Sequence, residues 1–200
     1  MDPLLLAGHD ILEPPDFRDL VKATVNFAFR YRTVMGKSAD YLIKLSIQLA
    51  ESLRREKLTV QDIKKKFLET AGDSDFRIKF EIFCPGTSKL GFYVIKKIED
   101  YISSGQGITV LDQSAQQHLE HIMPQIITLE EWSHLYSGNV VNEKFSSYLD
   151  RVGNLTVLEK NINSHIKNKN FDYKVKNENQ KGYTDSVLKL PKKIQTFSNN

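Results

Sequence analysis

The chain has 200 residues and a net charge of +3 at pH 7, which suits one domain or two small domains that share a core. Its single cysteine, Cys84, excludes an internal disulfide and a multi-cysteine zinc site, and it predicts a reducing, cytoplasmic environment. The first residues lack the pattern of a signal peptide, and no run of about 18 apolar residues predicts a membrane span.

Positive charge is concentrated towards the C-terminal end. Residues 159–200 contain nine lysines and four acidic residues, a balance of +5, so the rest of the chain sums to −2. Such asymmetry favours a polyanionic partner near this end. The alternative is that these lysines only solvate the surface, which is the commoner role of lysine.

The first half of the chain predicts amphipathic helices. Leu42, Leu45, Leu49 and Leu53 recur at three- and four-residue steps, as on one face of a helix. Ser38 is placed to cap that helix, and Thr59 with Asp62 approximates a capping box for the next one. We expect a small helical bundle with helices over residues 17–32, 39–57, 59–71, 75–83 and 88–102.

The pattern changes after Gly105 and Gly107, where short β-prone segments begin. Strands are predicted at residues 108–111, 118–123 and 154–158, and helices at 128–136, 141–152, 159–168 and 171–180. The helix at 128–136 would begin with a capping box of Thr128 and Glu131, and Gly153 would follow the helix at 141–152. The predicted fold is therefore mainly α with a small β component, comprising a helical region at 1–107 and a second domain at 108–200.

Polar residues that could act in catalysis or bind a metal ion follow one another in a characteristic order in this second domain. Glu120 and His121 lie near the end of one short strand, and Pro124 prevents that strand from continuing. Asn154 begins the next strand, and Asn163 follows on a helix. This order is typical of a ββα metal finger, in which two strands and a helix surround one divalent cation.

Such a set suits hydrolysis of a phosphodiester. Histidine, with an unperturbed pKa of about 6.5, is largely neutral at pH 7 and can take a proton from the attacking water. Oxygen ligands from Glu120 and Asn163 would suit Mg²⁺ or Mn²⁺, with His165 as a less favoured alternative to Asn163. Asn154 would hold the second ring nitrogen of His121. Because neighbouring strand residues point to opposite faces, residues 120 and 121 converge only if the backbone turns there.

These residues also resemble a known family. The blocks EHIMPQ (120–125), GNLTVL (153–158), the Asn-rich turn 161–163 and Phe171 to Lys174 are similar to the C-terminal domain of GmrSD-type modification-dependent restriction endonucleases, which are HNH (His-Me finger) nucleases. The first block and the interval from Asn154 to Asn163 are also similar to the HNH domain of RNA-guided CRISPR nucleases. The preceding helices resemble the segment before the nuclease domain in the GmrSD-type enzymes.

The resemblance implies a role for each matched residue. His121 would be the general base, Glu120 and Asn163 metal ligands, and Asn154 the middle asparagine, while Gln125 and Asn161 are further candidates within the matched blocks. It implies DNA as the substrate, Mg²⁺ or Mn²⁺ as the cofactor, and restriction of foreign or modified DNA as the role. In the family, a nucleotide-hydrolysing, ParB-like domain usually precedes this region, so such a domain or subunit is an expected partner.

Ordinary interpretations remain beside these predictions. A histidine next to a glutamate is usually a surface pair, and an asparagine after a glycine is often a turn residue. Lys167, Lys169 and Lys174 are candidate contacts to the DNA backbone and carry no base specificity. Two alternatives to a nuclease are a catalytically inactive nucleic-acid-binding module and a fragment that docks onto a missing subunit. For the second we expect a large apolar patch on the N-terminal helices.

Overall fold

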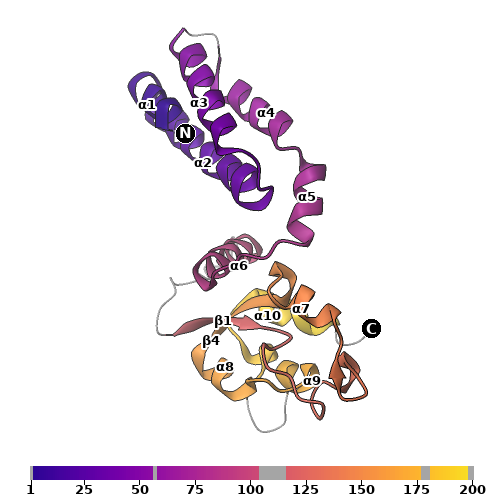
Figure 1. Ribbon diagram of the computed structural model, residues 1–200. Helices are drawn as coiled ribbons and strands as arrows, with labels where there is room; N and C mark the ends of the chain where they lie inside the picture. Colours follow the sequence, from indigo (N-terminus) through magenta and orange to yellow (C-terminus); the bar gives the residue numbers. More distant parts are fainter. Residues whose placement is uncertain (1, 56–57, 104–115, 177–180, 198–200) are drawn as a thin grey trace. The chain divides into compact units, whose positions relative to one another are not determined.

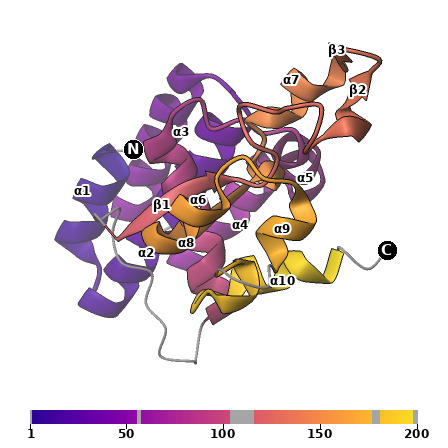
Figure 2. The same cartoon turned by 90° about the horizontal axis from the view of Figure 1, so that it is seen from below.

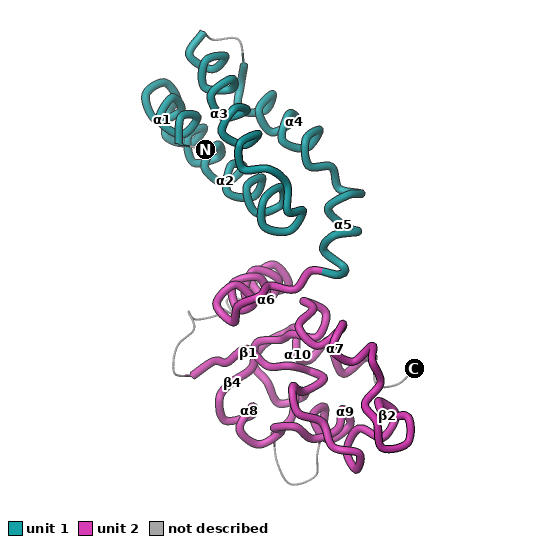
Figure 3. The backbone as a smooth tube through the Cα atoms, viewed as in Figure 1, with its two compact units in different colours: residues 1–82 teal, residues 83–200 magenta. Residues whose placement is uncertain are grey.

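The computed structural model describes residues 2–55, 58–103, 116–176 and 181–197. The chain divides into two compact units, Met1–Ile82 and Phe83–Asn200 (Figure 3). Both are mainly helical, and two small sheets lie in the second unit, which confirms the predicted fold class at this level. Among the described residues, no helix is long and apolar enough to cross a membrane. The strand predicted at 108–111 and the expected domain boundary at 107 lie outside the described residues.

Unit 1, residues 1–82, is a bundle of amphipathic helices (Figure 1). Its elements are α1 (Asp2–Ile11), α2 (Pro14–Ala28), the π-helical turn η1 (Phe29–Val34), α3 (Ala39–Arg54), α4 (Val60–Thr70) and α5 (Asp73–Glu81).

The core of unit 1 is apolar and follows the predicted helix periodicity. Leu45, Leu49 and Leu53 of α3 are buried with Ile63 of α4, and the rings of Phe27 and Phe67 stack with centroids 4.2 Å apart. The capping box at the start of α4 is confirmed: Asp62 N donates to Thr59 Oγ1 at 3.2 Å, and Thr59 N donates to the Asp62 carboxylate at 2.9 Å. The hydrogen bonds from Thr59 lower the pKa of Asp62.

Unit 2, residues 83–200, surrounds a two-stranded sheet. Its longer elements are α6 (Ser88–Ser103), β1 (Gln117–His121), α7 (Lys144–Leu149), β4 (Leu155–Glu159), α8 (Lys160–Ile166), α9 (Phe171–Val175) and α10 (Lys189–Ile194). Its shorter ones are η2 (Ser133–Leu135), β2 (Tyr136–Ser137), β3 (Val140–Val141), η3 (Val152–Asn154), η4 (Tyr183–Asp185) and η5 (Gln195–Phe197). Helix α6 therefore belongs to the same compact unit as the sheet, whereas the sequence placed it with the N-terminal helices.

Strands β1 and β4 pair antiparallel, with Glu120 opposite Thr156 and His121 opposite Leu155. Helices α6 and α8 lie on opposite sides of this pair (Figure 1). Helix α6 approaches so closely that a Cβ on Gly91 would lie 2.9 Å from Leu119 Cδ2. Since opposed residues share a face, Leu119, His121 and Leu155 face the α6 side, and Glu120 and Thr156 face the other. The second face is covered by an apolar cluster of Leu158, Ile162, Ile166, Val175 and Tyr183.

The helix predicted at residues 128–136 is wrong. Residues 128–141 form a turn, the short helix η2 and the hairpin of β2 and β3, which stands at the edge of unit 2 (Figure 2). The local cap is present, because Glu131 N donates to Thr128 Oγ1 at 3.4 Å. Other contacts prevail over it. Buried Trp132 donates through Nε1 to the distant Asn168 O at 3.0 Å, and within the segment the Tyr136 hydroxyl donates to Ile127 O at 3.0 Å.

Candidate functional site

His121, the last residue of β1, lies in an open pocket within unit 2. Its side chain is 20% exposed, so the imidazole is held by its surroundings and still reachable from solvent. The pocket has a volume of about 310 Å³ and is lined by Pro85, Gly86, Thr87, Ser88, Leu119, His121, Gln125, Asp150 and Leu155. The loop before α6, the ends of both strands and the end of α7 therefore meet around this histidine.

Asp150 is the acidic residue in contact with the imidazole. Its Oδ1 lies 3.2 Å from His121 Nε2, and the residue caps the C-terminus of α7. An ionised carboxylate accepts hydrogen bonds, so this contact favours the tautomer that carries its proton on Nε2. Nδ1 is then left with its lone pair, as a general base requires. The sequence offered no signal for Asp150, because its contact depends on where α7 ends in space.

Asn154 lies beside the histidine segment, but its amide contacts backbone groups. Its Oδ1 accepts from Met123 N at 2.7 Å, and its Nδ2 donates to Met123 O at 2.9 Å and Leu149 O at 2.7 Å. Its carbonyl accepts from Ile122 N at 2.9 Å. Asn154 therefore holds the two residues that follow His121, while Asp150 makes the contact to the ring that was expected of Asn154.

Glu120 points to the face of the sheet opposite His121 and forms a buried ion pair. Its Oε1 accepts from Lys174 Nζ at 2.6 Å, and the same ammonium donates to His121 O at 2.8 Å. Glu120 is 8% exposed and Lys174 is 0% exposed. Burial raises the pKa of Glu120 and lowers the pKa of Lys174, and the attraction between the two charges offsets part of both shifts. A buried Lys174 does not reach a DNA backbone, in contrast to its expected role.

Glu120, one of the two expected metal ligands, does not lie on the same face of the sheet as the expected base His121. Asn163, the other, lies half-exposed on α8. No group of three or more His, Cys, Asp or Glu side chains that could hold a metal ion occurs among the described residues. The Lys174 ammonium already occupies the cation position at Glu120, and it would repel a second cation there. As arranged, these residues do not fit a divalent cation bound through Glu120.

The remaining candidates lie at the surface. Gln125 is exposed and shares the pocket with His121. Asn161, His165 and Lys167 are exposed on or just after α8 and do not line that pocket.

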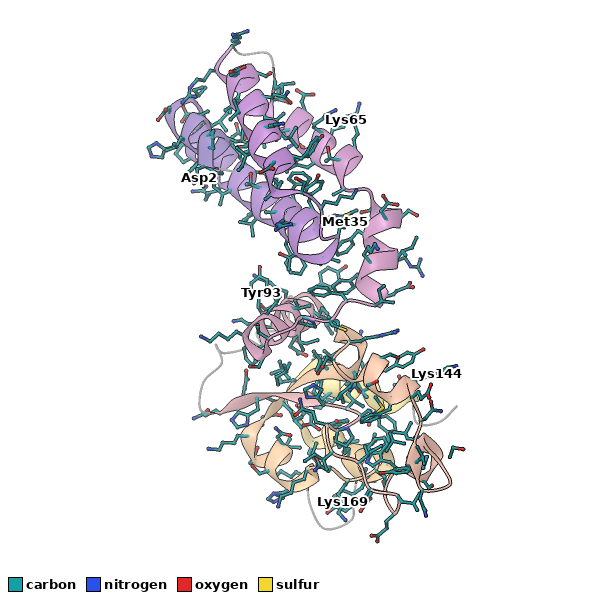
Figure 4. All side chains as sticks on the ribbon, in the orientation of Figure 1. Asp2, Met35, Lys65, Tyr93, Lys144 and Lys169 are labelled. Carbon is teal, nitrogen blue, oxygen red and sulfur yellow. The ribbon has the colours of Figure 1, made fainter. Side chains whose placement is uncertain are left out.

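Lys169 is also exposed, at the surface of unit 2 (Figure 4). Its Nζ donates to Glu131 Oε1 at 2.5 Å, which raises the pKa of Lys169 and lowers that of Glu131. Lys169 is therefore already paired with an acid, whereas Lys167 has no such partner among the contacts of the described residues.

A histidine in an open pocket at a strand end, backed by an acid, is an arrangement suited to hydrolysis by general base catalysis. In agreement with that class, residues 71–199 match the family model of the C-terminal domain of GmrSD restriction endonucleases. The match covers α5 and nearly all of unit 2, which is more than half of the chain, so the chain belongs to this restriction endonuclease family. A comparison with curated proteins found no match.

Proposed function

We propose that the chain hydrolyses phosphodiester bonds of DNA as an HNH-type endonuclease, with His121 as the general base. The observation that carries this proposal is the pocket in which the imidazole is reachable and Asp150 Oδ1 lies 3.2 Å from Nε2. Membership of the restriction endonuclease family supports the choice of DNA as substrate and restriction of foreign DNA as the role.

In the proposed reaction, Nδ1 of His121 takes a proton from water as the water oxygen attacks phosphorus. The imidazole becomes an imidazolium, and the adjacent Asp150 carboxylate stabilises this positive charge. The bond between phosphorus and the leaving oxygen of the DNA chain then breaks, and this oxygen keeps the electron pair and takes a proton from solvent. The imidazolium returns its proton to solvent, which restores the base. A positioned base of this kind contributes roughly 10²- to 10⁴-fold in rate.

A requirement for Mg²⁺ or Mn²⁺ stays a prediction, and no step is assigned to a metal. Glu120 would have to leave Lys174 before it could bind one, and Asn163 would be its expected companion from α8. Cleavage assayed with Mg²⁺, with Mn²⁺ and with a chelator tests this requirement directly.

The expected partner domain also stays a proposal. Apolar side chains are exposed on the helices of unit 1, including Leu6 at 63%, Ile43 at 51% and Leu68 at 55%. A contiguous patch of such side chains would mark contact with another domain or subunit, and a ParB-like one is expected from the resemblance.

A second candidate function is DNA binding without cleavage. The observation that favours it is the ion pair between Glu120 and Lys174, which leaves the Glu120 carboxylate unable to serve as a metal ligand in this arrangement. Binding through Lys167 and its neighbours would then weaken steeply as salt is raised.

Supercoiled DNA incubated with wild type, His121→Ala and Asp150→Asn separates these functions. We expect nicking or linearisation by the wild type, loss of it in His121→Ala and a smaller decrease in Asp150→Asn. His9→Ala, an exposed histidine on α1, is the matched control and should cleave normally. Cleavage that persists in His121→Ala would overturn the assignment of the base, and salt-sensitive binding without cleavage by the wild type would favour the second function.

A further inference from the structure

The buried ammonium of Lys174 links two consecutive residues at the end of β1. Nζ donates to the Glu120 carboxylate at 2.6 Å and to the carbonyl of His121 at 2.8 Å. The second of these bonds reaches the backbone of the proposed catalytic base itself. A fully buried ammonium is costly unless its charge is paired and its donors are used, and both conditions are met at this position.

The helix that carries Lys174 is anchored at its start. Asn170 caps α9 by accepting from Tyr173 N through Oδ1 at 3.0 Å. Glu131 in turn accepts from Asn170 N at 3.1 Å and from Asn170 Nδ2 at 2.9 Å. The start of α9 is therefore fixed to the segment before η2, which limits the positions that Lys174 can adopt.

The end of α9 is covered by the segment that begins at Gly182. A Cβ on Gly182 would lie 2.6 Å from Val175 O and 2.8 Å from Lys174 O, so the two backbones are in direct contact. Tyr183 follows, and it is 0% exposed. Burial, with a smaller contribution from the charge of Glu120, raises the pKa of the Tyr183 phenol. Lys174 and Glu120 are thus enclosed together and shielded from water.

From these contacts we propose that Lys174 is a positioning residue for His121, and that Glu120 serves as its buried partner rather than as a metal ligand. The inference rests on the proposed function in one respect, the role of His121 as base. Lys174 holds the His121 carbonyl and Asn154 holds Ile122 and Met123 after it, while the pairing of β1 with β4 holds the residues before it. The imidazole is therefore directed into its pocket from a backbone that is fixed on both sides.

Four variants test the pair: Lys174→Met, Glu120→Gln, the double variant, and Lys176→Met, an exposed lysine nearby, as the control. Each single change leaves one buried charge without its partner, so each should lower the melting temperature. The double variant should recover part of that loss, because neither unpaired charge remains. Lys176→Met should unfold as the wild type does.

Cleavage kinetics and metal binding complete the experiment. In Lys174→Met we expect kcat to fall about 10- to 100-fold while KM stays nearly constant, because a displaced base affects the reaction more than DNA binding. The double variant should not recover kcat, since methionine cannot donate to the His121 carbonyl. In a titration with Mn²⁺ alone, Glu120→Gln should bind Mn²⁺ with the same affinity as the wild type does.

Two results would overturn the proposal. One is a decrease in melting temperature in the double variant that equals the sum of the two single decreases, and the other is loss of Mn²⁺ binding in Glu120→Gln. If the wild type cleaves no DNA, the proposed function fails, and the melting temperatures and the Mn²⁺ titration still decide the roles of Glu120 and Lys174. Should a single variant fail to fold, recovery of folding in the double variant supports the pair, and its absence opposes it.

Discussion

The two units are stabilised by different means. In unit 1 the buried polar residues among those described are Thr24 and Ser46, and the core is otherwise a row of apolar helix faces. Among the residues of unit 2 that the structure describes, seven polar or charged ones are buried: Glu99, Ser103, Gln117, Glu120, Thr156, Lys174 and Ser186. Apolar packing is enough to hold regular helices together. Short strands and loops need directional contacts as well, and the candidate site lies in the unit that has them.

Glu99 illustrates the second means of stabilisation. Its carboxylate is 1% exposed and accepts from Lys189 N, Leu190 N and Ser103 Oγ, each at 2.7 Å. One buried acid thus satisfies the free backbone groups at the start of α10 and attaches that helix to α6. The comparison predicts that substitutions in unit 2 change the positions of the candidate site residues and therefore the activity, whereas substitutions in unit 1 affect stability alone.

The largest effect is expected from His121→Ala. Removal of the base should lower the cleavage rate about 10²- to 10⁴-fold, while the melting temperature stays close to that of the wild type, because the side chain lines an open pocket. Parallel cleavage assays and thermal scans measure both quantities. A large decrease in melting temperature would indicate that His121 is a structural residue.

The counterpart in unit 1 is Ile63→Ala. Ile63 is 0% exposed within the apolar core, so the cavity should reduce the free energy of unfolding by about 2–5 kcal/mol. Urea denaturation measures this loss, and kcat below the unfolding transition should not change. A reduced kcat at low temperature would contradict the division of roles between the units.

Glu99→Gln should have an intermediate effect. The neutral amide replaces an acceptor that three donors share, so we expect a loss of about 1–3 kcal/mol in the free energy of unfolding. Asp100→Asn is the control at the next position. Equal stability of the two variants would argue against the role of Glu99 in holding α10.

The smallest effect concerns pH and Glu131. The hydrogen bonds from Lys169 and Asn170 lower the pKa of Glu131 below its unfolded value of about 4.3. A depressed pKa contributes stability above the unfolded value, and this contribution is lost as pH falls through the folded value. Glu131→Gln should therefore flatten the decline in melting temperature below about pH 4. An unchanged decline would show that other acids cause it.

Local patterns predicted much of the fold. Leucine periodicity indicated α3, and Thr59 with Asp62 correctly marked the start of α4, because both depend only on neighbours in the chain. The strands β1 and β4 were predicted within one or two residues of their bounds. The helix at 128–136 failed since Trp132 and Glu131 are drawn to residues 168–170, and no local pattern records such distant partners.

The sequence also indicated part of the candidate site, whose role stays a proposal. The strand end at His121 and the nearby Gln125 were identified, and both line the pocket. Asp150 was missed, and Glu120 was expected beside His121 even though alternation along a strand favours opposite faces. A buried lysine 54 residues away in the sequence holds Glu120 on its own face, and this separation is why the sequence did not indicate the ion pair.

The contact of Gly182 with the end of α9 has a consequence for synthesis on the ribosome. The helices of unit 1 emerge early and contain their own core, whereas Lys174 is enclosed only after Gly182 and Tyr183 have left the exit tunnel. Until then its ammonium remains in water and does not hold the end of β1. The nascent protein should therefore acquire an ordered His121 only after the segment that begins at Gly182 has emerged and folded against α9, which would delay any nuclease activity until that step.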